Sequence, residues 1–174
     1  MYHHMTDRWG AIPYSQALKG AENIAPAFDQ QKDVYAGLFT QLDTAIGLIN
    51  DSAIQIEGDI MFNGDMVSWR RFANTLKMTM ALRMSDVDSS AAQAKFLEAV
   101  AGGVLASTSQ NVHYPYLDAV AHENPWKSAF RTRNDFAPSK RFVDYLKSNS
   151  DPRLYKMADG SKNSGGVTYE GMPY

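Results

Sequence analysis

One amphipathic segment, residues 66–84, constrains the fold of this chain more than any other feature. It follows Asp65, a residue type that favours the N-cap of a helix, and it contains neither glycine nor proline. Its apolar side chains recur every three or four residues, which is the period of one helix face. The residues on that face are Trp69, Phe72, Ala73, Leu76, Met80 and Arg83. Such a stripe is stable only when other elements cover it, so the segment predicts a core of packed helices.

Three more segments carry helical signals. Residues 29–49 have the same apolar spacing, with Asp29 as the expected N-cap. A capping-box pattern at residues 90–93 opens another helix, which the glycines at 102–103 end. The expected limits of the last helix are Pro138 or Ser139 at its start and Asp151-Pro152 at its end.

Both ends of the chain predict elements that continue beyond it. Residues 2–10 read as the end of a helix, closed by Gly10 in a left-handed C-cap. Residues 159–174 read as a loop rich in Gly and Ser. We therefore expect residues 1–174 to be part of a single domain that is truncated at both ends.

The helices at residues 29–49 and 66–84 correspond when one is shifted by 34 residues, the period of tetratricopeptide-type repeats. The matched pairs are Leu38 with Phe72, Leu42 with Leu76, and Ile46 with Met80. Composition adds long structured loops to this picture, since 14 of the 19 acidic residues are Asp and the chain has 12 Gly and seven Pro. The predicted fold is mostly α, with a tetratricopeptide-like helical-repeat scaffold and long structured loops.

Several functional classes conflict with the composition. The chain has no Cys, which rules out disulfides, Cys-ligated metal centres and a cysteine nucleophile. A formal net charge of -2 argues against nucleic acid as a partner. The sequence also has no Gly-x-Ser-x-Gly elbow, phosphate-binding glycine loop or His-Glu-x-x-His helix, so no cofactor is expected.

Aromatic residues in the long segment 103–135 indicate a binding site. Tyr114, Tyr116 and Trp126 lie next to prolines, and the polar side chains of Asn124 and Arg131 are close in sequence. A sugar ring needs this combination, because its C–H face stacks on an aromatic plane while its hydroxyls bond at the edge. Aromatics in loops also commonly anchor the loop to the protein body, and that second interpretation stays open.

Two other groups of residues have simpler interpretations than a functional site. His3 or His4 could share a metal with Asp7, but the sequence shows no further ligands at suitable spacing, so we predict no metal site. Glycoside hydrolysis needs two carboxylates around one bond. The loop candidates for that chemistry are Asp118, Glu123 and Asp135, which more commonly act as solvated or capping groups.

The helix at residues 66–84 carries four cations and no acid; they are Arg70, Arg71, Lys77 and Arg83. A basic amphipathic helix can lie on an anionic lipid surface. Because its apolar face is needed in the core, we expect these cations to pair instead with the Asp-rich loops and the helix C-terminus.

Four motifs occur in order along the chain. They are Asp-Arg-Trp-Gly-Ala-Ile-Pro-Tyr-Ser-Gln-Ala at 7–17, Leu-Asp-Thr-Ala-Ile at 42–46, Gly-Asp followed by Trp-Arg-Arg-Phe-Ala-Asn-Thr-Leu-Lys-Met-Thr-Met-Ala-Leu-Arg-Met within 64–84, and Asp-Pro-Arg-Leu at 151–154. Together they resemble the SusD/RagB-like family of outer-membrane glycan-binding lipoproteins of Bacteroidetes. The most specific motif departs from the family at Thr75, where Ser is usual, and at Thr79, where Arg is common.

The resemblance implies a fold of tetratricopeptide-like helix pairs with a loop-rich region that holds glycan, and it implies no catalysis. It also implies a SusC-like TonB-dependent transporter as partner and a place on the cell-surface side of the outer membrane. Family members are longer, and their lipid anchor lies outside this chain. The matched positions imply scaffold roles rather than ligand contacts for Trp69, Phe72, Asn74, Leu76 and Arg83.

The leading hypothesis is a non-enzymatic protein that binds an oligosaccharide and delivers it to the transporter. A second hypothesis is a helical-repeat interaction scaffold whose ligand site lies elsewhere. The third is a glycosidase that uses the loop carboxylates.

Overall fold

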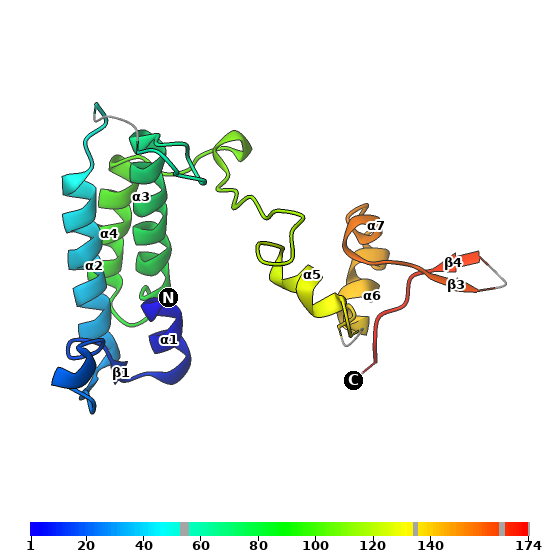
Figure 1. Ribbon diagram of the computed structural model, residues 1–174, viewed down its shortest axis with the longest axis horizontal. Coiled ribbons are helices and arrows are strands. Elements are labelled where there is room, and N and C mark those ends of the chain that lie inside the picture. The colour runs from blue at the N-terminus through cyan, green and yellow to red at the C-terminus, as the bar shows by residue number, and fades with distance from the viewer. Residues whose placement is uncertain (53–55, 134–135, 164–165, 174) are drawn as a thin grey trace. The chain divides into compact units, whose positions relative to one another are not determined.

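The computed structural model describes residues 1–52, 56–133, 136–163 and 166–173. They form two compact units, Met1–Pro115 and Tyr116–Tyr174, and each is described by itself. Helices are the main regular structure of both units, which confirms the predicted mostly α fold (Figure 1). Within the described residues, no helix has both the length and the hydropathy needed to cross a membrane.

The first unit is built on the helices α1 to α4, and Figure 1 shows α2, α3 and α4 side by side. α1 spans Tyr2–Trp9, α2 Gln31–Leu48, α3 Met66–Arg83 and α4 Ser89–Ala101. α3 packs most extensively on α4 and also contacts α2. The core at this interface consists of Tyr35, Phe39, Met80 and Ala81, with Leu38, Leu42, Leu76, Met84 and Phe96 packed against it. Several positions matched by the 34-residue shift therefore share one core.

Three of the predicted helix limits are confirmed in the first unit, one of them the end of α4 at Ala101, directly before Gly102. The Asp65 carboxylate accepts a hydrogen bond from Val67 N at 3.0 Å and caps α3. Gly10 follows α1 with φ +73°, a conformation that an L side chain rarely adopts.

Two other expected caps are wrong. Asp29 does not cap α2; its carboxylate accepts from the amides of Tyr14 and Ser15 at 3.0 and 2.8 Å, and from the Ser15 hydroxyl at 2.7 Å. These donors occupy both of its oxygens, and α2 begins after Gln30 without a side-chain cap. α4 begins two residues earlier than the capping box predicted, because the N-cap is Asp88, which accepts from Ala91 N at 3.0 Å, and not Ser90.

The segment before α2 contains short regular pieces. β1 (Ile12–Pro13) pairs antiparallel with β2 (Phe28–Asp29), and the 3₁₀ turn η1 (Gly20–Glu22) lies between them. The Asp29 carboxylate therefore joins the two ends of the segment between β1 and β2 and does not start a helix.

The loop before α3 is organised by Asp59, which the sequence did not single out. Its carboxylate accepts from the amides of Met61, Phe62 and Gly64 at 3.0, 3.3 and 2.9 Å, and from Trp69 Nε1 at 2.7 Å. Desolvation, the largest single influence, raises the pKa of Asp59, but the hydrogen bonds from these donors outweigh it and lower that pKa to about 2. The Trp69 ring is thus fixed to the loop by hydrogen bonding.

The other residues assigned to the scaffold also lie in contacts between elements. Phe72 is 6.2 Å from Phe62 of the loop before α3 between ring centroids. Asn74 is buried, and its Nδ2 donates to Gly102 O at the end of α4 at 2.9 Å. Arg83 Nη1 lies 2.9 Å from the Asp7 carboxylate of α1. The substituted Thr75 accepts from Leu105 N at 2.9 Å, where a Ser hydroxyl could do the same.

The cations of α3 are paired partly as predicted. Arg70 reaches Asp51 at 2.8 Å and also donates to carbonyls at the C-terminus of α2, in agreement with the expectation. Lys77 differs: its side chain is only 3% exposed, and its Nζ lies 2.5 Å from Asp43 of α2 and 2.7 Å from Glu98 of α4. It bridges helices because it faces their interface rather than a loop.

The second unit holds three short helices and a hairpin (Figure 1). α5 spans Pro125–Phe130, α6 Lys140–Ser148 and α7 Leu154–Met157; β3 (Ser161–Asn163) pairs antiparallel with β4 (Gly166–Thr168). Its small core is Val143, Leu146 and Leu154, with Ala158 and Tyr169 against it. Ser139 caps α6 as predicted, but α6 ends at Ser148, three residues before Asp151. A 3₁₀ turn, η2 (Thr108–Gln110), belongs to the first unit.

Candidate functional site

The predicted binding segment contains a short helix that the sequence analysis treated as loop. The Asn124 Oδ1 atom accepts from Trp126 N at 2.9 Å, and Pro125 occupies the first helical position of α5. An N-cap Asn followed by Pro is a recognised helix start, so this signal was present in the sequence and was missed. The oxygen of Asn124 is therefore engaged in capping.

Trp126 projects from α5 with a largely uncovered ring. It is 65% exposed, and its ring contacts Phe136 edge to face, with centroids 5.4 Å apart and planes at 86°. Phe136 also contacts Phe130, one turn further along α5, at 6.0 Å. This edge contact holds the indole in place while leaving most of its surface accessible, as a stacking platform requires.

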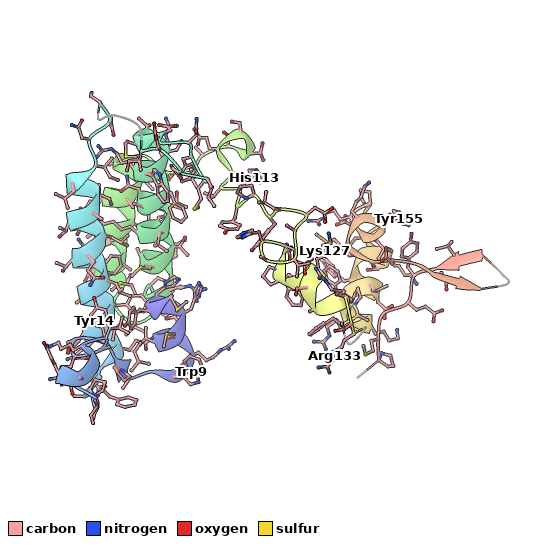
Figure 2. The ribbon with its side chains drawn as sticks, viewed as in Figure 1. Trp9, Tyr14, His113, Lys127, Arg133 and Tyr155 are labelled. Carbon is pink, nitrogen blue, oxygen red and sulfur yellow. The ribbon has the colours of Figure 1, made fainter. Side chains whose placement is uncertain are left out.

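Charged side chains follow the aromatic ones along the same helix. Arg131 Nη2 lies 2.5 Å from Glu123 Oε2, and the Glu123 side chain is only 3% exposed. Among the described residues, the other oxygen of Glu123 is buried without a hydrogen-bond partner. Lys127, labelled on α5 in Figure 2, pairs with Asp118, and hydrogen bonding to Asp118 raises the pKa of Lys127.

The five residues predicted to contact glycan are only partly brought together. Trp126, Asn124 and Arg131 lie on or next to α5 in the second unit. Tyr116 belongs to the same unit and precedes a turn closed by the hydrogen bond from Leu117 N to His122 O at 2.9 Å. Tyr114 belongs to the first unit. We use "α5 cluster" for Glu123, Trp126, Lys127, Phe130 and Arg131.

The carboxylates considered for hydrolysis have other roles where they are described. Hydrogen bonding to Lys127 lowers the pKa of Asp118, which is opposite to the shift that a general acid needs. Glu123 is buried against Arg131. Asp135 lies outside the described residues. These environments do not favour the glycosidase hypothesis.

The residues weighed as a metal site near the N-terminus, His3, His4 and Asp7, include two with other structural roles. Asp7 accepts from the Tyr35 hydroxyl at 2.6 Å and pairs with Arg83, so its carboxylate joins α1 to α2 and α3. His3 is buried, and desolvation lowers its pKa. Across the described ranges, no group of three or more His, Asp or Glu residues is placed to hold a metal ion.

A groove that the sequence did not predict lies between α2 and α4. This groove of about 590 Å³ is lined by aromatic side chains of α2, by Lys95 of α4 and by residues around the end of α3. Among its lining residues are Tyr35, Phe39, Asp43, Arg83, Met84 and Lys95. Local sequence patterns do not predict this groove, because its walls come from helices about 50 residues apart in the chain.

The first unit is a set of packed helices, and the second unit carries an exposed aromatic ring on the short helix α5. Residues 1–174 match the SusD-like family, described as starch-binding and associating with the outer membrane. The chain belongs to this family, which confirms the resemblance carried by its motifs. No curated protein matches it.

Solved structures agree with this assignment. A SusD homolog from Bacteroides uniformis matches with a TM-score of 0.85 and 28% identity over 97% of this chain and 36% of its own. One from Bacteroides ovatus matches with a TM-score of 0.78 and 30% identity over 97% and 36%. A chitin-binding protein matches with a TM-score of 0.79 and 29% identity over 97% and 38%. The chain thus spans a little over a third of the length of these proteins.

Proposed function

We propose that this protein is a non-catalytic, cell-surface glycan-binding component of a nutrient-uptake system. Trp126 carries the proposal, since its ring is 65% exposed and is anchored at one edge by Phe136. The family description as starch-binding and the similarity to a chitin-binding protein support a glycan as the ligand class.

Binding would combine stacking with hydrogen bonding at one surface. A sugar would place its C–H face on the Trp126 ring, and hydroxyls at the edge would accept from the guanidinium of Arg131, which remains partly exposed. Tyr116 and Tyr114 remain candidates for further contacts. In this binding mode no side chain makes or breaks a bond in the sugar, and the sugar would be released by a conformational change and not by a reaction.

The same proposal includes a partner protein and a cellular location. We infer delivery to a SusC-like TonB-dependent transporter from the cell-surface side of the outer membrane, with a lipid anchor in the complete protein. The family description as associating with the outer membrane supports the location.

The interaction-scaffold hypothesis is retained as a second candidate because of the groove between α2 and α4. Concave surfaces of helical repeats commonly receive protein segments. If this hypothesis is right, the protein retains transporter association but shows no affinity for sugars.

The experiment is a titration of starch and chitin oligosaccharides into wild-type protein and two tryptophan variants. Trp126→Ala should weaken binding about tenfold or more, because one stacked ring and its buried area are lost. Trp9→Ala is the matched control, since Trp9 is 64% exposed but belongs to α1 of the first unit. Equal affinity for all three proteins would remove Trp126 from the site, and new reducing ends would refute the non-catalytic assignment.

A further inference from the structure

We propose that Glu123 neutralises Arg131 and thereby makes the α5 cluster select uncharged glycans over uronate-bearing ones. This inference rests on the proposed function and concerns the same surface. Glu123 acts through Arg131 and is therefore a positioning residue, since its own carboxylate is buried.

The first step of the argument is the arrangement of side chains on α5. Residues four apart lie one turn apart on the same side of a helix. Trp126 and Phe130 therefore form an aromatic row, and Lys127 and Arg131 form a cationic row next to it. An aromatic row beside two free cations would suit a sugar acid, because Arg binds carboxylates in a bidentate manner.

The second step is that each cation already has an acidic partner, and the two partners differ in burial. The Asp118 side chain is 91% exposed, so its pair with Lys127 is weak and a ligand can displace it. The Glu123 side chain is 3% exposed and lies 2.5 Å from Arg131. A glycan cannot replace a buried carboxylate, so the charge of Arg131 stays compensated while its exposed N–H groups can still donate to hydroxyls.

The third step is that the charge can be removed without changing the shape of the site. Glu123→Gln keeps an oxygen that accepts from Arg131, and it places the amide nitrogen where Glu123 Oε1 has no described partner. Asp118→Asn is the matched control, because it removes the same charge from an exposed acid in the same surface.

The test compares pairs of oligosaccharides that differ only in a CH₂OH or a carboxylate at C6. Glucans with glucuronans and galactans with galacturonans would be arrayed and then titrated against the wild type, Glu123→Gln, Asp118→Asn and Trp126→Ala. The wild type should prefer the neutral member of each pair. Glu123→Gln should bind the uronate about tenfold more tightly than the wild type, as one added charge-assisted hydrogen bond predicts. That gain should shrink at high salt, and Asp118→Asn should change either affinity by less than about threefold.

Four results would overturn the inference. A wild type that prefers uronates refutes it without any variant, so a Glu123→Gln protein that fails to fold does not remove the test. Equal loss of both ligands in Glu123→Gln would make Glu123 only a support of the local fold. No change in either affinity would show that Arg131 does not contact the glycan. Binding that is absent, or that Trp126→Ala leaves unchanged, would instead refute the proposed function on which the inference depends.

Discussion

Replacing Lys77 by methionine should be far less damaging than replacing it by alanine, although both changes remove the same charge. The Lys77 side chain is 3% exposed, with Nζ 2.5 Å from Asp43 and 2.7 Å from Glu98. Lys95 also reaches both acids, at 2.9 and 3.3 Å. The two carboxylates are partly exposed, so they keep Lys95 and water when Lys77 loses its charge.

The magnitudes follow from the aliphatic stem of Lys77. Methionine preserves a chain of similar length, and the two carboxylates that lose Lys77 are partly exposed and still paired with Lys95, so neither becomes an uncompensated buried charge. We therefore expect a loss of stability within about 1 kcal/mol. Alanine deletes three buried methylenes at about 0.8 kcal/mol each, which gives about 2.4 kcal/mol before any cavity cost. The difference between the variants should therefore exceed about 1.5 kcal/mol.

The assay is urea unfolding followed by circular dichroism at 222 nm, with the free energy of unfolding taken from the midpoint and slope. Lys32→Ala is the control, because Lys32 is exposed on α2 and should change the stability by less than about 0.5 kcal/mol. If Lys77→Met lost as much stability as Lys77→Ala, the paired charge rather than the buried stem would stabilise the interface, and the reasoning would be refuted.

Three further predictions concern the scaffold. Asp59→Asn should destabilise the protein at neutral pH, and its deficit should disappear as the pH falls. The lowered pKa of Asp59 gives the wild type stability that is complete above the ordinary value of 3.8 and is lost as the pH falls through about 2; a deficit that persists at pH 2 would contradict this. Gly102→Ala should cost about 1–2 kcal/mol in the same urea assay, because the new Cβ would lie 2.8 Å from Asn74 Nδ2. Gly47→Ala, which meets no atom within 4 Å inside α2, should instead stabilise by about 0.5–1 kcal/mol; a loss there would undermine both estimates.

The sequence by itself determined the helical core and the family. The spacing of apolar residues in 66–84 predicted α3, and Asp65 predicted its start, because both signals act within a few residues of the chain. The same local reasoning could have found α5 from Asn124 and Pro125, and its omission was an error of interpretation. Motifs in order along the chain were sufficient for the family assignment.

Only the tertiary structure decided where the charged side chains act. Asp29 could cap a helix or bind a loop, and the folded chain places the amides of Tyr14 and Ser15 against its carboxylate. The partners of Lys77 lie 34 residues before it and 21 after it, so no local pattern identifies them. Glu123 was a loop carboxylate in sequence, and burial against Arg131 made it a determinant of charge at the proposed site. Hydrogen bonds and ion pairs form with whichever group the packed helices place within reach, and sequence spacing does not encode that distance.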